Sequence, residues 1–241
     1  MQLSLFDTVF EKGISSINSS DDTKKLSKWQ LFEWFESKEG ELFSLEYKDR
    51  NMEASLPLKL GKMSFSLFSH STNEPVLRSF DNEKERVLTL SGRMESCVIK
   101  NDNLEFYFEH TSYRENKRMI ESGIKSKVQW KVKNNYITPL KQKKKLDIDD
   151  KLNQKEIIQQ LIGMPISIKV RFHNDLFSEF ISEPFVCSSL KIEKDTIMIA
   201  SPNDTTFKIN GFKKMRVSSE YLLFDVSTQE SGYSQSFYIL F

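Results

Sequence analysis

The sequence predicts an α+β protein that is mostly β, made of antiparallel meander sheets or small barrels with two or three helices. Long stretches alternate apolar and polar residues with a period of two, which is the pattern of half-buried strands. Short groups rich in Asn, Asp and Gly separate these stretches and predict turns. Gly (8) and Pro (6) are too scarce among 241 residues for a loop-dominated or fibrous chain.

Helical periodicity is confined to a few short segments. Residues 24–38 carry closely spaced aromatic residues on one side of a predicted helix, and Asp21 or Asp22 is expected to cap it. Residues 112–123 predict a short helix that ends at a glycine, and residues 153–162 predict another. We expect these helices to pack on sheets.

Shifts in composition divide the chain into four segments. The expected order is a flexible tail over residues 1–23, a β-rich domain with a leading helix over 24–133, a basic linker over 134–152, and a small β-barrel-like domain with a leading helix over 153–241. Short strands at regular spacing in the last segment favour a barrel or a rolled sheet.

Charge and cysteine content favour a cytoplasmic protein. Lys and Arg number 35 against 34 Asp and Glu, so the molecule as a whole has no polyanion-binding composition. Cys97 and Cys187 lie far apart in apolar surroundings and predict buried free thiols rather than a disulfide. No apolar run is long enough to cross a membrane, and the N-terminus lacks the pattern of a signal peptide.

The first residues of the chain place three apolar side chains in a tail with nothing local to pack on. These residues are Gln2, Leu3, Ser4, Leu5 and Phe6. The pentapeptide resembles the motif by which bacterial replication and repair proteins bind the sliding clamp, the DNA polymerase III beta subunit. The resemblance implies that Leu5 and Phe6 fill an apolar pocket of the clamp, that Leu3 supports them, and that Gln2 hydrogen-bonds at the rim. The remaining possibility is that residues 3–10 form a first strand.

A second resemblance concerns residues 163–218. Their strand spacing and apolar pattern resemble the small β-domain of YolD-like proteins, which accompany translesion polymerases in some bacteria. The resemblance rests on pattern, without a diagnostic motif, and implies no site residue.

A basic segment lies between residues 114 and 145. It contains eleven Lys and Arg residues but only Glu115 and Glu121 as acids, with Tyr113, Trp130 and Tyr136 interleaved. Lysines that neutralise phosphates beside aromatics that stack on bases are typical of a nucleic-acid surface, while the simpler interpretation is a solvated strand face and linker. The residues we expect to contact DNA are Lys127, Lys131, Lys133, Lys141, Lys143, Lys144 and Lys145.

The sequence contains no phosphate-binding glycine loop and no Cys or His pair at metal-ligand spacing, so we predict no cofactor and no catalytic residue. His70, His110 and His173 are scattered, and Asp147, Asp149 and Asp150 follow a lysine run that they balance. The resulting hypothesis is an accessory protein of bacterial or phage DNA replication or repair, recruited to the clamp. Two alternatives are a clamp inhibitor that blocks polymerase access, and a DNA-acting, nuclease-like enzyme whose carboxylates are gathered by the fold.

Overall fold

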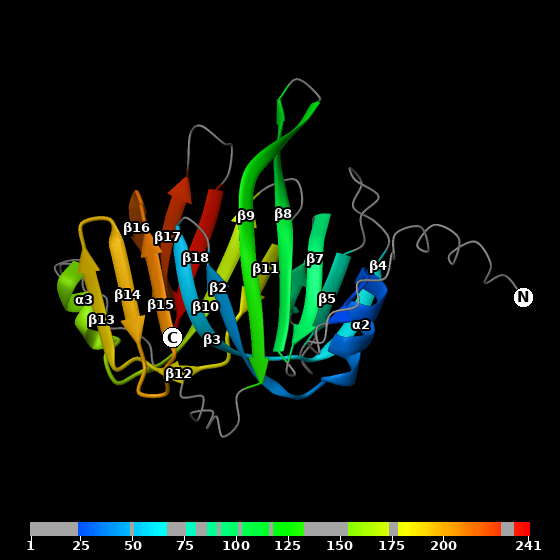
Figure 1. Cartoon of the computed structure of the whole chain (residues 1–241). Helices are drawn as coiled ribbons and strands as arrows, with labels where there is room; N and C mark the ends of the chain where they lie inside the picture. The colour runs from blue at the N-terminus through cyan, green and yellow to red at the C-terminus, as the bar shows by residue number, and fades with distance from the viewer. Residues whose placement is uncertain are drawn as a thin grey trace, which may run out of the picture.

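Two antiparallel sheets and two helices make up the described part of the structure, a computed structural model (Figure 1). It describes residues 24–48, 51–66, 76–80, 86–90, 93–100, 103–115, 118–132, 154–173, 178–227 and 234–241. The predicted class, mostly β with antiparallel sheets, is confirmed, and neither sheet closes into a barrel.

The described residues of the first half form one helix and nine strands. In chain order they are β1 (Lys24–Lys25), α2 (Lys28–Ser37), β2 (Leu42–Lys48), β3 (Met52–Lys59), β4 (Lys62–Ser66), β5 (Val76–Phe80), β6 (Arg86–Leu90), β7 (Arg93–Lys100), β8 (Asn103–Glu115) and β9 (Arg118–Val132).

Apart from β1 and β12, the second half repeats this order, a helix followed by eight strands. Its elements are α3 (Gln154–Gln160), β10 (Pro165–His173), β11 (Ser178–Ile181), β12 (Phe185–Val186), β13 (Ser189–Glu193), β14 (Thr196–Ala200), β15 (Thr206–Asn210), β16 (Lys214–Val217), β17 (Tyr221–Ser227) and β18 (Ser234–Leu240).

Each sheet combines strands from both halves of the chain. The first sheet runs β1-β7-β8-β9-β2-β3-β15-β14-β13, and the second runs β16-β17-β18-β10-β11-β6-β5-β4, with β12 paired to β10. Apart from β1 in the first sheet and β12 in the second, the two orders match strand for strand, because β3 receives the three-strand meander of the second half while β11 receives that of the first. The fold is therefore an internal duplication in which the halves exchange a meander. The domain boundary predicted at residues 134–152 stays a prediction.

Matching backbone hydrogen bonds mark the duplication at the ends of the two helices. Gly40 N donates to Leu60 O at 2.8 Å, and Gly163 N donates to Cys187 O at 2.7 Å. The return bonds run from Leu60 N and from Cys187 N to the residues after the two glycines. Both glycines have a left-handed backbone, with φ of +83° and +85°, a conformation that glycine adopts at little cost.

Aromatic rings from the two sheets meet in the core. The Tyr47 ring of the first sheet lies 5.6 Å from Phe172 and 6.4 Å from Phe180 of the second. Further along the core, the rings of Phe207 and Phe237 are 5.9 Å apart. Burial of such side chains is the main favourable contribution to folding, so the inner faces hold the two sheets together.

The first helix starts later than the sequence predicted. Ser27 caps it in a capping box with Gln30: Gln30 N donates to Ser27 Oγ at 3.3 Å, and Ser27 N donates to Gln30 Oε1 at 3.0 Å. Asp21 and Asp22 lie outside the described residues, and residues 24–25 form a strand paired with β7. The predicted start was wrong because a reciprocal cap adjacent to the apolar run satisfies the first N–H groups.

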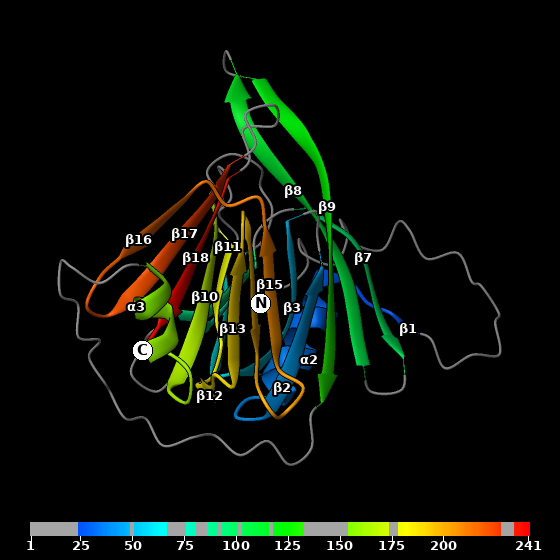
Figure 2. The same ribbon diagram turned by 90° about the vertical axis from the view of Figure 1, so that its left-hand side faces the viewer.

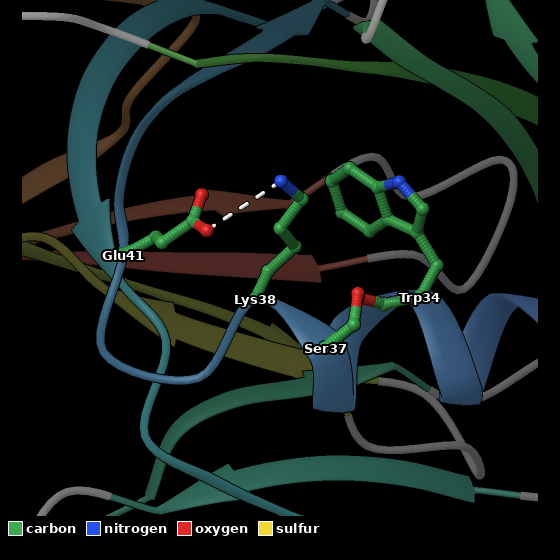
Figure 3. Close-up of polar contacts among 4 residues, drawn as sticks. All are labelled: Trp34, Ser37, Lys38 and Glu41. Carbon is green, nitrogen blue, oxygen red and sulfur yellow. Dashed lines mark hydrogen bonds and ion pairs between the residues drawn. The ribbon is translucent and has the colours of Figure 1, made fainter.

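The helix packs one face on β4 and β7 and leaves the other to solvent. Leu31 and Phe35 are fully buried, whereas Trp29 is 53% exposed. At the C-terminal end, Lys38 Nζ lies 3.5 Å from Glu41 Oε1, on the side where the Trp34 indole lies (Figure 3). Figure 1 shows α2 at one end of the sandwich and α3 at the other. Neither of these described helices is long and apolar enough to cross a membrane.

The helix predicted over residues 112–123 is instead part of two long strands. Thr111 pairs with Glu121, and Arg114 pairs with Met119, within the β8–β9 hairpin. Long-range pairing has overridden the local signal. Pairing with β7 ends at Glu109 and pairing with β2 ends at Lys127, so the hairpin extends beyond its neighbours (Figures 1 and 2).

The exchanged meanders make the two halves depend on each other. Expressed alone, residues 153–241 leave β13–β15 without β3 and β11 without β6, so we expect no stable monomer, since unpaired edges associate. Co-expression with residues 1–152 should restore a single folded species, measured by circular dichroism and size-exclusion chromatography. Cooperative unfolding of the isolated fragment would contradict the dependence.

Both cysteine thiols are free and fully buried, as the sequence predicted. Burial raises the pKa of Cys97 to about 12 and that of Cys187 to about 11. The thiolate is the reactive form, so iodoacetamide at pH 8 should label neither thiol in the folded protein and both in urea, as followed by mass spectrometry.

The same pKa shifts predict an alkaline effect on stability. Above about pH 9 the thiols ionise in the unfolded chain but stay protonated in the folded one, so the free energy of unfolding falls by up to about 1.4 kcal/mol per pH unit for each thiol. Below that pH the thiols contribute no pH dependence. Rapid labelling of the folded protein would contradict their burial.

Candidate functional site

The duplicated fold places two cross-strand ion pairs at matching positions. On the first sheet, Lys48 Nζ lies 3.3 Å from Glu53 Oε1, and these residues are register partners in β2 and β3. On the second sheet, Arg171 Nε donates to Glu179 Oε2 at 3.2 Å, and these residues are register partners in β10 and β11. Both pairs lie on the outer face of their sheet, opposite the aromatic core.

Exposure distinguishes the two pairs. The Lys48 and Glu53 side chains are 70% and 58% exposed. The Arg171 side chain is 36% exposed and the Glu179 side chain only 4%. Lys169 Nζ lies 3.6 Å from the same Glu179 oxygen. The second sheet therefore encloses a carboxylate between two cations, while the first leaves its pair in water.

Polar side chains continue on both sides of Glu179 across the outer face. We call the residues that follow the register through Glu179 the Glu179 row; in strand order from β16 to β5 they are Lys214, Asp225, Ser236, Arg171, Glu179, Thr89 and Arg78. Ser236 Oγ donates to Asp225 Oδ1 at 2.7 Å, and Arg216 Nη2 lies 2.9 Å from Asp225 Oδ2. The row is thus a polar band across seven strands, from β16 to β5.

Two aromatic rings border the row. The Arg171 guanidinium lies 5.5 Å from the centre of the Tyr238 ring, within the range of a cation–π interaction. The Tyr221 ring meets Tyr238 edge to face at 5.6 Å. The face combines planar aromatic surface with fixed charge, a composition suited to holding a polar ligand.

Thr89 is the hydroxyl residue directly across from Glu179. Thr89 is 2% exposed, and its Oγ1 has no hydrogen-bond partner in the part of the chain that the structure describes. A buried hydroxyl without a hydrogen bond lowers the stability of a fold by about 1–3 kcal/mol. A ligand that hydrogen-bonds to Thr89 Oγ1 would remove this cost.

The described residues contain no group of three or more His, Cys, Asp or Glu side chains that could hold a metal ion. Both thiols are buried in the core, with pKa values raised far above neutrality by that burial.

The sequence-predicted site residues fall elsewhere. Lys127 lies on β9 opposite Lys48, and Lys131 lies on β9 opposite Ser44, so both belong to the first sheet. Gln2, Leu3, Ser4, Leu5, Phe6, Lys133, Lys141, Lys143, Lys144 and Lys145 lie outside the described residues. The roles assigned to all of these residues stay predictions.

Sequence reasoning missed the Glu179 row. The alternation within Ile166–Phe172 does show that Lys169 and Arg171 share one face of a strand. Glu179 and Thr89 are 90 residues apart in the chain, and only the pairing of β11 with β6 brings them together.

No protein-family model and no curated protein matches this chain. Solved structures that resemble it include the apo form of PhuS, a heme-binding protein from Pseudomonas aeruginosa, with 8% identity and a TM-score of 0.40. That alignment covers 90% of this chain and 81% of PhuS. Another is ChuS, an E. coli heme oxygenase, with 10% identity and a TM-score of 0.33, covering 90% of this chain and 83% of ChuS.

The predicted function in DNA replication or repair is therefore corrected. The solved structures that the chain resembles are heme proteins rather than replication or repair factors, and no comparison supports a clamp or DNA partner. The hypothesis was wrong because it rested on five tail residues and a run of lysines, which say nothing about the packed body. The pentapeptide and YolD-like resemblances are not tested by these findings and stay predictions.

The two ion pairs give a matched test of enclosure. Arg171→Met should lower the free energy of unfolding by about 3 kcal/mol, near the low end for breaking a buried pair because Lys169 remains beside the carboxylate. Lys48→Met should cost less than about 1 kcal/mol, as is typical of an exposed pair. Urea denaturation measures both, and equal effects of the two substitutions would contradict the difference in environment.

Proposed function

We propose that this protein is a cytoplasmic ligand-binding protein and that its binding face is the outer face of the second sheet around the Glu179 row. The observation that carries the proposal is the contrast between matched positions, because the carboxylate of the cross-strand ion pair is exposed in the first half and enclosed in the second. Free buried thiols support the cytoplasmic placement.

Enclosure makes this face more effective for binding than its counterpart. Electrostatic interactions are stronger where water is excluded. Lys169 and Arg171 are held in place by Glu179, and Arg171 is also held over the Tyr238 ring. Side chains that are already ordered lose little entropy when a ligand binds. On the first sheet, water and salt ions would compete with any ligand for the exposed Lys48 and Glu53 side chains.

A fragment screen by protein-observed NMR tests the proposal. The probes cover carboxylic acids, phosphates, amines and flat aromatic acids, and hemin belongs to the set as a flat dicarboxylate. We expect at least one probe to bind and to shift the amide signals of β10, β11 and β18. The Arg171→Met variant should no longer bind this probe, whereas the Lys48→Met variant should bind it as wild type does. The two variants remove one cation each at matched positions.

The contrary result is equally clear. Hits whose shifts map to the first sheet, or that bind wild type and Arg171→Met equally, would overturn the proposal. A screen without any hit on the second sheet would do the same.

A further inference from the structure

We propose that the part of the ligand that lies beside Glu179 is an anionic group, a carboxylate or a phosphate, held by Lys169 Nζ and Thr89 Oγ1. This inference rests on the proposed function and names the chemical class that the enclosed face takes.

The formal charge of the face favours an anion. The Glu179 row and its two flanking cations, Arg216 and Lys169, contain five basic side chains and two carboxylates, a formal excess of three positive charges. A cationic group would meet this excess as repulsion, whereas an anionic group would reduce it. The carboxylates do not remove the preference, because Asp225 and Glu179 each lie against at least one cation.

Lys169 has donors to offer. Its side chain is 20% exposed, and within the described residues its contact with Glu179 is an ion pair at 3.6 Å, longer than a hydrogen bond. An ammonium group carries three N–H donors. Glu179 therefore holds Lys169 in place while leaving donors of Nζ for a second acceptor.

Thr89 supplies a hydroxyl on the other side of Glu179. Its Oγ1 is buried and has no partner within the described part of the chain, and Thr89 is the register partner of Glu179 on β6. Lys169 and Thr89 thus flank the same carboxylate from β10 and β6. At the matching position of the first sheet, Glu53 faces Lys208, so the hydroxyl belongs to the second sheet alone.

Titration with sodium phosphate and with sodium citrate, each at constant ionic strength set with sodium chloride, tests the inference by NMR. We expect saturable shifts at the Thr89 and Lys169 amides for at least one of the two, which identifies the phosphate or the carboxylate source. Lys169→Met and Thr89→Val should each weaken that binding about tenfold, the effect of one charge-assisted hydrogen bond. Lys48→Met should leave it unchanged.

The free energy of unfolding of the variants shows whether the Thr89 hydroxyl binds the ligand or stabilises the fold. Thr89→Val keeps the shape of the side chain and removes a hydroxyl that has no partner, so the variant should be at least as stable as wild type while losing affinity. Lys169→Arg keeps the charge and is used if Lys169→Met fails to fold; retained binding is then expected. A Thr89→Val variant that is less stable and binds as well as wild type would overturn the inference.

The remaining outcomes are distinguishable from failure of the proposed function. One outcome is that neutral or amine fragments bind the second sheet of wild type but not of Arg171→Met, while phosphate and citrate do not bind. This outcome would overturn the inference of an anionic ligand group and would leave the proposed binding face standing. Anion binding that none of these variants weakens also overturns the inference. If no probe of any class binds this face, both proposals fail.

Discussion

Two strand pairs, β3 with β15 and β11 with β6, are the contacts on which the rest of the structure depends. Each joins the end of one half's sheet to the meander of the other half, and so turns four open edges into two continuous sheets. Open edges are prone to association, and the exchange removes them from the middle of the molecule. Between the two sheets the aromatic rings face one another, Tyr47 against Phe172 and Phe207 against Phe237.

Duplication provides an internal comparison that a single structure seldom offers. Gly40 and Gly163 follow the two helices with the same backbone geometry, and the strands after them carry a cross-strand ion pair at equivalent positions. What differs is the surroundings of that pair. A charge pair in water is worth little because solvent already stabilises each ion, whereas an enclosed carboxylate depends on its partners. Equivalent backbone positions thus carry different energetics, and this contrast between the two sheets is the basis of the proposed binding face.

The site shows how far sequence reasoning can reach in a β-rich chain. The alternation in residues 166–172 places Lys169 and Arg171 on one face of a strand, and this much is visible without a structure. Their partner Glu179 lies on the next strand, and Thr89 comes from the opposite half of the chain. Strand pairing over such separations leaves no local signal, because it depends on which edges remain open once each meander has formed. The basic segment, by contrast, was easy to detect by composition, and its lysines at 127 and 131 lie on the other sheet.

By itself the sequence determined the fold class, the two leading helices, the position of most strands and the burial of both thiols. These features follow from local periodicity and the solvation of apolar side chains, both of which are expressed over short distances along the chain. Only the tertiary structure decided the exchange of meanders, the conversion of residues 112–123 into strand, and the enclosure of Glu179. The physical reason is the same for all three: hydrogen bonding between strands and the exclusion of water are properties of residues brought together in space.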